Sequence, residues 1–171
     1  MREACLGVNI DEHLTWLKHI DSIRLKVTRH LWVLKKVRDF LNVNCLLSLY
    51  NAIIEPYFLY CSIVWDYISD SLESKLQKWQ NRSARIITKS SYLKSSSLIL
   101  FELGWQTIKE MRNKHKAILM YKIMTGLAPS YLSEMFTFSS VAYLGGGLNT
   151  LLNATKYATE SPKTFFDEIH C

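Results

Sequence analysis

The sequence predicts a mainly all-α protein: a helical bundle of about five to six helices, with a short N-terminal β-strand and turn and an irregular C-terminal tail. Two observations support this fold class. Apolar residues recur every three or four positions through most of the chain, and 49% of the 171 residues are apolar, as in globular proteins. We expect a strand and turn over residues 1–17, a helical region over 18–138, and a divergent or disordered tail over 139–171.

The N-terminal part changes from a strand pattern to a helix pattern near His19. Residues 4–10 read ACLGVNI, a short run typical of a β-strand, and the turn-like NIDEH overlaps its end. From His19 the apolar residues follow a period of ~3.6, and Lys and Arg take much of the remaining surface. This pattern predicts an amphipathic helix of about five turns that ends near Phe40.

The next helix is apolar on almost every side. Asn42 or Asn44 can cap it, and it reads CLLSLYNAIIEPYFLYCSIVWDY. A helix that is apolar all round is typical of a buried position, so we expect it at the centre of the bundle. Pro56 lacks an amide donor and clashes one turn back, which predicts a kink or a division into two helices.

Residues 72–89 carry two stripes at helical spacing, and Asp70 or Ser71 can cap this helix. The apolar stripe contains Leu72, Leu76, Trp79, Ser83 and Ile86, widened by Ala84 and Ile87. The basic stripe contains Lys75, Lys78, Arg82, Arg85 and Lys89. At ~100° per residue the two stripes lie about a quarter turn apart, which predicts one side packed on a core and a cationic ridge facing outward.

Three further segments complete the expected elements. Residues 98–103 predict a short helix that ends at Gly104. Thr107 and Glu110 have the spacing of a capping box, which predicts the start of a helix that ends at Gly126. A final short helix, SYLSEMF, follows Pro129; beyond Ser139 the sequence shows no clear element.

The charge of the chain favours an acidic partner. Between residues 18 and 122 there are 18 Lys and Arg against 8 Asp and Glu, a local excess of 10, within a chain of formal charge +6. Three helices carry rows of basic residues, and rows that converge would neutralise phosphates without reading sequence. The nucleic-acid-binding residues we expect are Arg24, Arg29, Lys75, Lys78, Arg82, Arg85, Lys89, Arg112 and Lys116. The alternative for each row is an ordinary solvated helix surface.

The five tryptophans are second candidates, because an indole ring can stack on a base. Trp65 and Trp79 lie in apolar stripes, which favours a place in the core. Trp16 and Trp105 stand beside turns, and their role stays open; Trp32 lies in the first amphipathic helix.

No residue pattern predicts catalysis or a bound metal. Asp11 and Glu12 could form a carboxylate pair, but an exposed turn is the simpler interpretation. The five histidines and four cysteines show no spacing of a metal site, and the scattered cysteines are typical of a reducing compartment. We expect no catalytic residue, no metal ligand and no cofactor.

The sequence also bears on where the chain resides. We expect no membrane-spanning helix, because no long apolar run is free of charge. The N-terminus, MREACLG, lacks the apolar core of a signal peptide. An intracellular protein of the cytoplasm or nucleus, not a secreted one, is therefore expected.

Four segments in order, LGVNIDEHLTWLKHID, SLYNAIIEPYFLYCSIVWD, LQKWQNRSARIIT and LGWQTIKEMRNKHKAILMYKIMTGLAPSYLSEMF, resemble one region of a known family. That region follows the polymerase palm in reverse transcriptases of non-LTR retrotransposons of the LINE or jockey type. The resemblance covers roughly residues 5–138. It implies that residues 1–17 are a remnant of the edge strand of the palm. It also implies that residues 18–138 are the thumb and its C-terminal extension, which in that family grips RNA or an RNA–DNA duplex.

The chain also departs from that family. The family's catalytic motif is Tyr-x-Asp-Asp on a strand of the palm, where Asp residues hold Mg²⁺, and this sequence does not contain the motif. We therefore expect a fragment of an RNA-directed DNA polymerase, inactive alone, whose partners are nucleic acid and the missing palm domain. Two alternatives stay open: a transposable-element relic without function, and a helical protein–protein interaction module capable of self-association.

Overall fold

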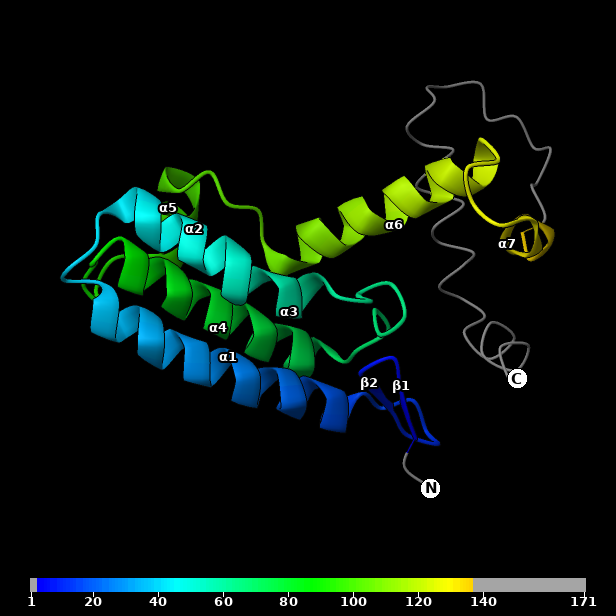
Figure 1. The fold of residues 1–171 in the computed structure, drawn as a ribbon, viewed down its shortest axis with the longest axis horizontal. Helices are drawn as coiled ribbons and strands as arrows, with labels where there is room; N and C mark the ends of the chain where they lie inside the picture. The colour runs from blue at the N-terminus through cyan, green and yellow to red at the C-terminus, as the bar shows by residue number, and fades with distance from the viewer. Residues whose placement is uncertain (1–2, 137–171) are drawn as a thin grey trace. The chain divides into compact units, whose positions relative to one another are not determined.

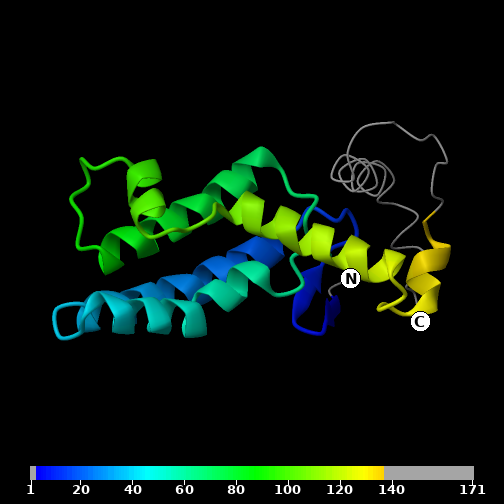
Figure 2. The ribbon, with the colours of Figure 1, turned by 90° about the horizontal axis from the view of Figure 1, so that it is seen from above.

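The structure is a computed structural model and describes residues 3–136. The chain divides into two compact units, Met1–Arg112 and Asn113–Cys171. In the first unit, α1 lies alongside the paired helices α2 and α3 and alongside α4 (Figures 1 and 2). The predicted mainly helical fold with a short N-terminal β element is confirmed. The predicted tail, residues 139–171, lies outside the described residues, and the predicted boundaries after residues 17 and 138 stay predictions.

The N-terminal β element is a hairpin and not the single strand expected over residues 4–10. Strands β1 (Glu3–Cys5) and β2 (Val8–Ile10) pair antiparallel around a two-residue turn. Leu6 and Gly7 both have positive φ, 48° and 82°, the conformation that tight hairpin turns of this hand require. The hydroxyl of Tyr60 donates to the carbonyl oxygen of Leu6 at 2.8 Å, which ties this strained turn to the helical part of the unit.

A carboxylate organises the loop between the hairpin and α1 (Leu17–Val37). Asp11 accepts hydrogen bonds from the backbone amides of His13, Thr15 and Trp16 at 3.2, 3.0 and 3.1 Å. The hydroxyl of Thr15 donates to the same carboxylate at 2.9 Å. These bonds, led by the one from Thr15, lower the pKa of Asp11. The predicted turn role of Asp11 is therefore confirmed, and α1 begins two residues before the expected start.

Helices α2 (Val43–Ile53) and α3 (Glu55–Leu59) replace one continuous helix. Asn42 caps α2 by accepting a hydrogen bond from the amide of Cys45 at 2.9 Å, and Pro56 stands in the first turn of α3, as predicted. The predicted burial of the whole apolar helix is wrong for α2. Only Leu46 and Tyr50 of α2 are buried, because the helix packs on α1, α3 and α4 from one side.

Helix α4 (Asp70–Ile87) buries most of its predicted apolar stripe. Trp79 is only half-buried, and Gln80 takes an interior place instead, since its side-chain amide donates to the carbonyl oxygen of Gln106 at 2.9 Å. Gln77 accepts a hydrogen bond from the amide of Ile108 at 3.0 Å. The N-cap is Ser69, one residue before the expected Asp70 and two before the expected Ser71. Two glutamines thus hold α4 to the segment that leads into α6.

The remaining helices agree with their sequence signals. Helix α5 (Ser96–Glu102) is followed by Gly104, whose φ is 65°. The capping box of α6 (Ile108–Met124) is confirmed: the amide of Thr107 donates to the Glu110 carboxylate at 2.8 Å, and the Glu110 amide donates back to the Thr107 hydroxyl at 3.2 Å. In the second unit the short helix α7 (Ser130–Glu134) follows the residues that end α6.

The core of the first unit lies between α1, α4 and the paired helices α2 and α3. Its fully buried side chains include Val27, Leu34, Leu46, Phe58, Leu76 and Ile87. Helices α1 and α4 run in the same direction, as the ion pair of 3.9 Å between Asp39 and Lys89, just beyond their C-terminal ends, also indicates (Figure 1). Parallel packing of α1 and α4 fixes which of their residues face outward together.

His19 joins the hairpin to the helices as a neutral base. The amide of Asn9 donates to its Nδ1 at 3.4 Å, its ring lies 5.6 Å from that of Trp65, and only 5% of the residue is exposed. Burial, with the positive charge of Lys26, lowers the pKa of His19 from its ordinary 6.5. A protonated ring could not accept the hydrogen bond from Asn9.

Acidification should therefore destabilise the first unit through His19. Because the folded pKa is the lower one, the unfolded chain binds a proton first, and stability falls as the pH drops from about 7.5 to about 5.5. Urea unfolding at the two pH values measures this loss. The variant His19→Asn keeps an acceptor for Asn9 but cannot titrate, so its unfolding free energy should change much less. An equal pH dependence in both proteins would assign the effect to other groups.

Candidate nucleic-acid interface

Two segments of the first unit carry cations and no carboxylates. Between Asp21 and Asp39 the chain has six Lys and Arg and no Asp or Glu. Between Glu73 and Glu102 it again has six Lys and Arg and no acidic residue. The first segment lies mostly on α1 and the second begins on α4, and these two helices pack side by side. A cation-rich surface therefore follows from the packing of two particular helices.

The contacts of α1 show which side of this helix faces α4. Val27 faces the core, and the rings of His30 and Tyr57 of α3 stack at 5.5 Å, so one side of α1 is turned toward α3. At ~100° per residue, Lys35 lies roughly 80° from Val27 on the other side, and Lys36 roughly 180° from it. Both lysines are exposed. Lys35 lies on the side of α1 that faces α4, and Lys36 lies on the side opposite the core.

The contacts of α4 likewise show which side of this helix faces α1. Gln77 and Gln80 face the segment before α6, so α1 packs on the opposite flank of α4. Lys75 and Arg82 lie roughly 140° and 160° from Gln80 in the direction of α1, and Lys78 lies roughly 160° from it the other way. All three are exposed.

We call the resulting surface the basic face; it consists of Lys35, Lys36, Lys75, Lys78 and Arg82. No carboxylate of residues 3–136 lies within ion-pair distance of any of the five. Two neighbouring basic residues are paired: Arg24 with Asp21 at 3.0 Å, and Lys89 with Asp39 at 3.9 Å. The unpaired charges of the basic face lie in the last turn of α1, at Lys35 and Lys36, and in the middle of α4, from Lys75 to Arg82.

The other predicted binding residues have different surroundings. Arg24 and Arg29 are exposed on α1, and Arg29 lies farther round the helix than Lys36. Arg85 is half-buried: its guanidinium donates to the hydroxyl of Ser96 at 2.9 Å and lies 5.9 Å from the ring of Tyr92. Lys116 is half-buried in the second unit. Sequence reasoning left Lys35 and Lys36 out of the site, although the absence of acidic residues between Asp21 and Asp39 was a usable signal.

Arg112 is an interior residue and is not available to a phosphate. Only 4% of it is exposed, its guanidinium donates to the Glu73 carboxylate at 2.8 Å, and its Nε lies 3.4 Å from the carboxylate of Asp66. The guanidinium also lies 5.4 Å from the ring of Trp65. The prediction for Arg112 is therefore corrected: it neutralises two carboxylates and joins α6 to α4 and to the loop before α4.

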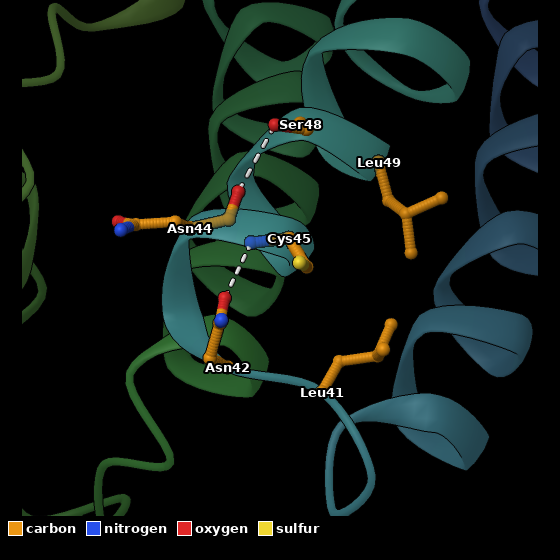
Figure 3. A pocket seen from close by; sticks show the side chains of 6 residues that line it. All are labelled: Leu41, Asn42, Asn44, Cys45, Ser48 and Leu49. Carbon is orange, nitrogen blue, oxygen red and sulfur yellow. Dashed lines mark hydrogen bonds between the residues drawn. The ribbon is translucent and has the colours of Figure 1, made fainter.

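The described residues give little to suggest small-molecule chemistry. Residues 3–136 contain no group of three or more His, Cys, Asp or Glu placed to hold a metal ion. A shallow hollow at the start of α2 is lined by Leu41, Asn42, Asn44, Cys45, Ser48 and Leu49 (Figure 3). Two of its polar side chains bond within the helix: Asn42 accepts from the amide of Cys45 at 2.9 Å, and Ser48 donates to the carbonyl oxygen of Asn44 at 3.0 Å.

None of the described helices is long and apolar enough to cross a membrane.

Comparison with known proteins identifies relatives among transposon polymerases of Drosophila melanogaster. The chain is 32% identical over 116 residues to a probable RNA-directed DNA polymerase from transposon X-element. It is 23% identical over 114 residues to one from transposon BS, and 30% identical over 87 residues to the RNA-directed DNA polymerase from mobile element jockey. These matches cover 66%, 64% and 48% of this chain, but the chain spans only 13%, 12% and 9% of the relatives' length.

The resemblance found in the sequence is therefore confirmed. Homologues of this chain are RNA-directed DNA polymerases of non-LTR retrotransposons, matched over about half to two thirds of its length. No family model matches the chain, and no solved structure matches it.

Arg112→Ala should destabilise the first unit by about 3–5 kcal/mol, because it removes the buried guanidinium that neutralises two largely buried carboxylates. Their side chains are only 16% and 18% exposed. Lys109→Ala is the matched control, since Lys109 contacts the same Glu73 at 3.6 Å but its side chain is 66% exposed. That change should cost less than about 1 kcal/mol. Urea unfolding followed by circular dichroism compares them, and equal losses would contradict the interior role of Arg112.

Proposed function

We propose that this part of the chain binds the phosphate backbone of RNA or of an RNA–DNA duplex through the basic face. In a non-LTR polymerase this role would be that of the thumb and the segment after it. The observation that carries the proposal is the set of five cations on two parallel helices, none with a carboxylate partner among residues 3–136. A solvated helix surface usually mixes both signs of charge, and this one does not.

The geometry suits a polyanion better than a small anion. Residues three or four apart on a helix stand about 5–6 Å apart, and packed helices lie about 8–10 Å apart, so the five cations spread over two rows. A small anion would reach one or two of them, whereas a nucleic-acid backbone can reach several. Lys and Arg contacts of this kind neutralise phosphates and carry no sequence information.

The catalytic step is not assigned to these residues. The relatives are named RNA-directed DNA polymerases, but the matched part is a small share of their length, and the 171 residues contain no Tyr-x-Asp-Asp. We propose that Mg²⁺ and the palm that would hold it belong to a different part of such a polymerase. The predicted self-association also stays a prediction, which light scattering over a range of concentrations can test.

Replacing Lys75, Lys78 and Arg82 together by Gln should weaken binding to duplexes of any sequence. Each lost phosphate contact should reduce the slope of log affinity against log salt by about 0.7–0.9, so the triple variant should lose roughly 2–3 from that slope. Filter binding of an RNA duplex and an RNA–DNA duplex over a salt series gives both affinity and slope.

The control replaces Lys109, Lys114 and Lys122 by Gln, three exposed lysines of α6, and removes the same net charge. This variant should bind nearly as the unmodified chain does. Equal losses in the two triple variants would show that net charge, and not the basic face, governs binding. Absence of binding at low salt, or binding indifferent to salt, would refute the proposed function.

A further inference from the structure

Trp32 is an exposed tryptophan on the outer surface of α1. It is 63% exposed, whereas Trp16 and Trp65 are 1% and 0% exposed, and Trp79 and Trp105 are half-buried. Trp16 was an open candidate for base stacking, and its burial removes it from consideration. Exposure of so large an apolar ring to water is unfavourable, which makes Trp32 a candidate for contact with a ligand.

Trp32 lies on the same side of α1 as the basic face. At ~100° per residue it is roughly 140° from the core-facing Val27, between the directions of Lys35 and Lys36. The ammonium of Lys36 lies 5.2 Å from the centre of its ring. The ring therefore stands beside a cation, in the stretch of α1 that has no carboxylate.

We propose that Trp32 stacks on an unpaired base of the nucleic acid whose phosphates contact the basic face. This inference rests on the proposed function and specifies its ligand: a strand with at least one accessible base, and not a continuous duplex alone. In a duplex the faces of the bases are covered by their neighbours, so a side chain on a helix surface cannot stack on them. In a single strand every base offers a π-face, and a nearby lysine can pair with its phosphate.

The charge around Trp32 favours nucleic acid over an apolar protein partner. A protein surface covering the indole would also have to desolvate Lys36, which lies over the ring, and would bring Lys35 close to it. A nucleotide satisfies both groups at once, because the base takes the ring and the phosphate takes the ammonium. Trp32 would then set the preference between strands, while the lysines would supply most of the salt dependence.

The test uses the full chain with two probes, oligo(dT) of about twelve nucleotides and a long blunt duplex. Binding is measured by anisotropy of labelled probes and by quenching of tryptophan fluorescence. Trp32→Ala should lose about tenfold in affinity for oligo(dT) and little for the duplex. Trp32→Phe should retain most of the affinity, because phenylalanine also stacks. Phe101→Ala, which removes another exposed ring from α5, 84% exposed, should change neither affinity.

The outcomes separate this inference from the proposed function. If Trp32→Ala binds oligo(dT) as the unmodified chain does, or loses equally on both probes, stacking is refuted while salt-dependent binding by the basic face stands. If the unmodified chain binds neither probe at low salt, both proposals fail. If Trp32→Phe loses as much as Trp32→Ala, the indole acts by some means other than a π-face, and the stacking inference is overturned.

Discussion

The first unit depends on the parallel packing of α1 on α4 through two apolar stripes. Val27 and Leu34 of α1 and Leu76 and Ile87 of α4 are fully buried, so the rotation of each helix about its axis is fixed by its core residues. Once those side chains point inward, a helix at ~100° per residue has no freedom over where its other residues point. The basic face is a consequence of this constraint and needs no contact among its own members.

Local signals predicted the local structure well. Helical periodicity located α1 and α4, and short motifs located other helices: the capping box of Thr107 and Glu110 begins α6, Asn42 caps α2, and Pro56 divides the apolar helix. The turn of the hairpin could not be predicted in the same way. Leu6 is an uncommon residue at positive φ, and nothing in its own neighbourhood indicates the bond from Tyr60, 54 residues away, that holds it.

The candidate site was predictable only in part, because the type of a residue does not determine its environment. Arg112 stands among basic residues in the sequence, yet its partner Glu73 is 39 positions away, and only the tertiary structure brings them together. The exposure of the tryptophans was not predictable from their type either: Trp16, beside a turn, is buried, and Trp32, within a helix, is exposed. For Trp32 the helix pattern did contain the answer: it lies next to the core residue Leu31, one position and about 100° out of the apolar stripe.

The basic face has an energetic consequence for the folded chain itself. The five cations of the basic face repel one another, and the ion pairs that Asp21 and Asp39 make with Arg24 and Lys89 neutralise none of the five. The apolar core must therefore stabilise α1 against α4 despite that repulsion. A polyanion on the basic face removes the repulsion and adds attraction, so binding and folding favour each other. Salt acts on the two in opposite directions: screening relieves the repulsion in the free chain and weakens the attraction in the complex. If the proposed function holds, the same five side chains cost stability in the free chain and supply the attraction to a nucleic-acid backbone in the complex.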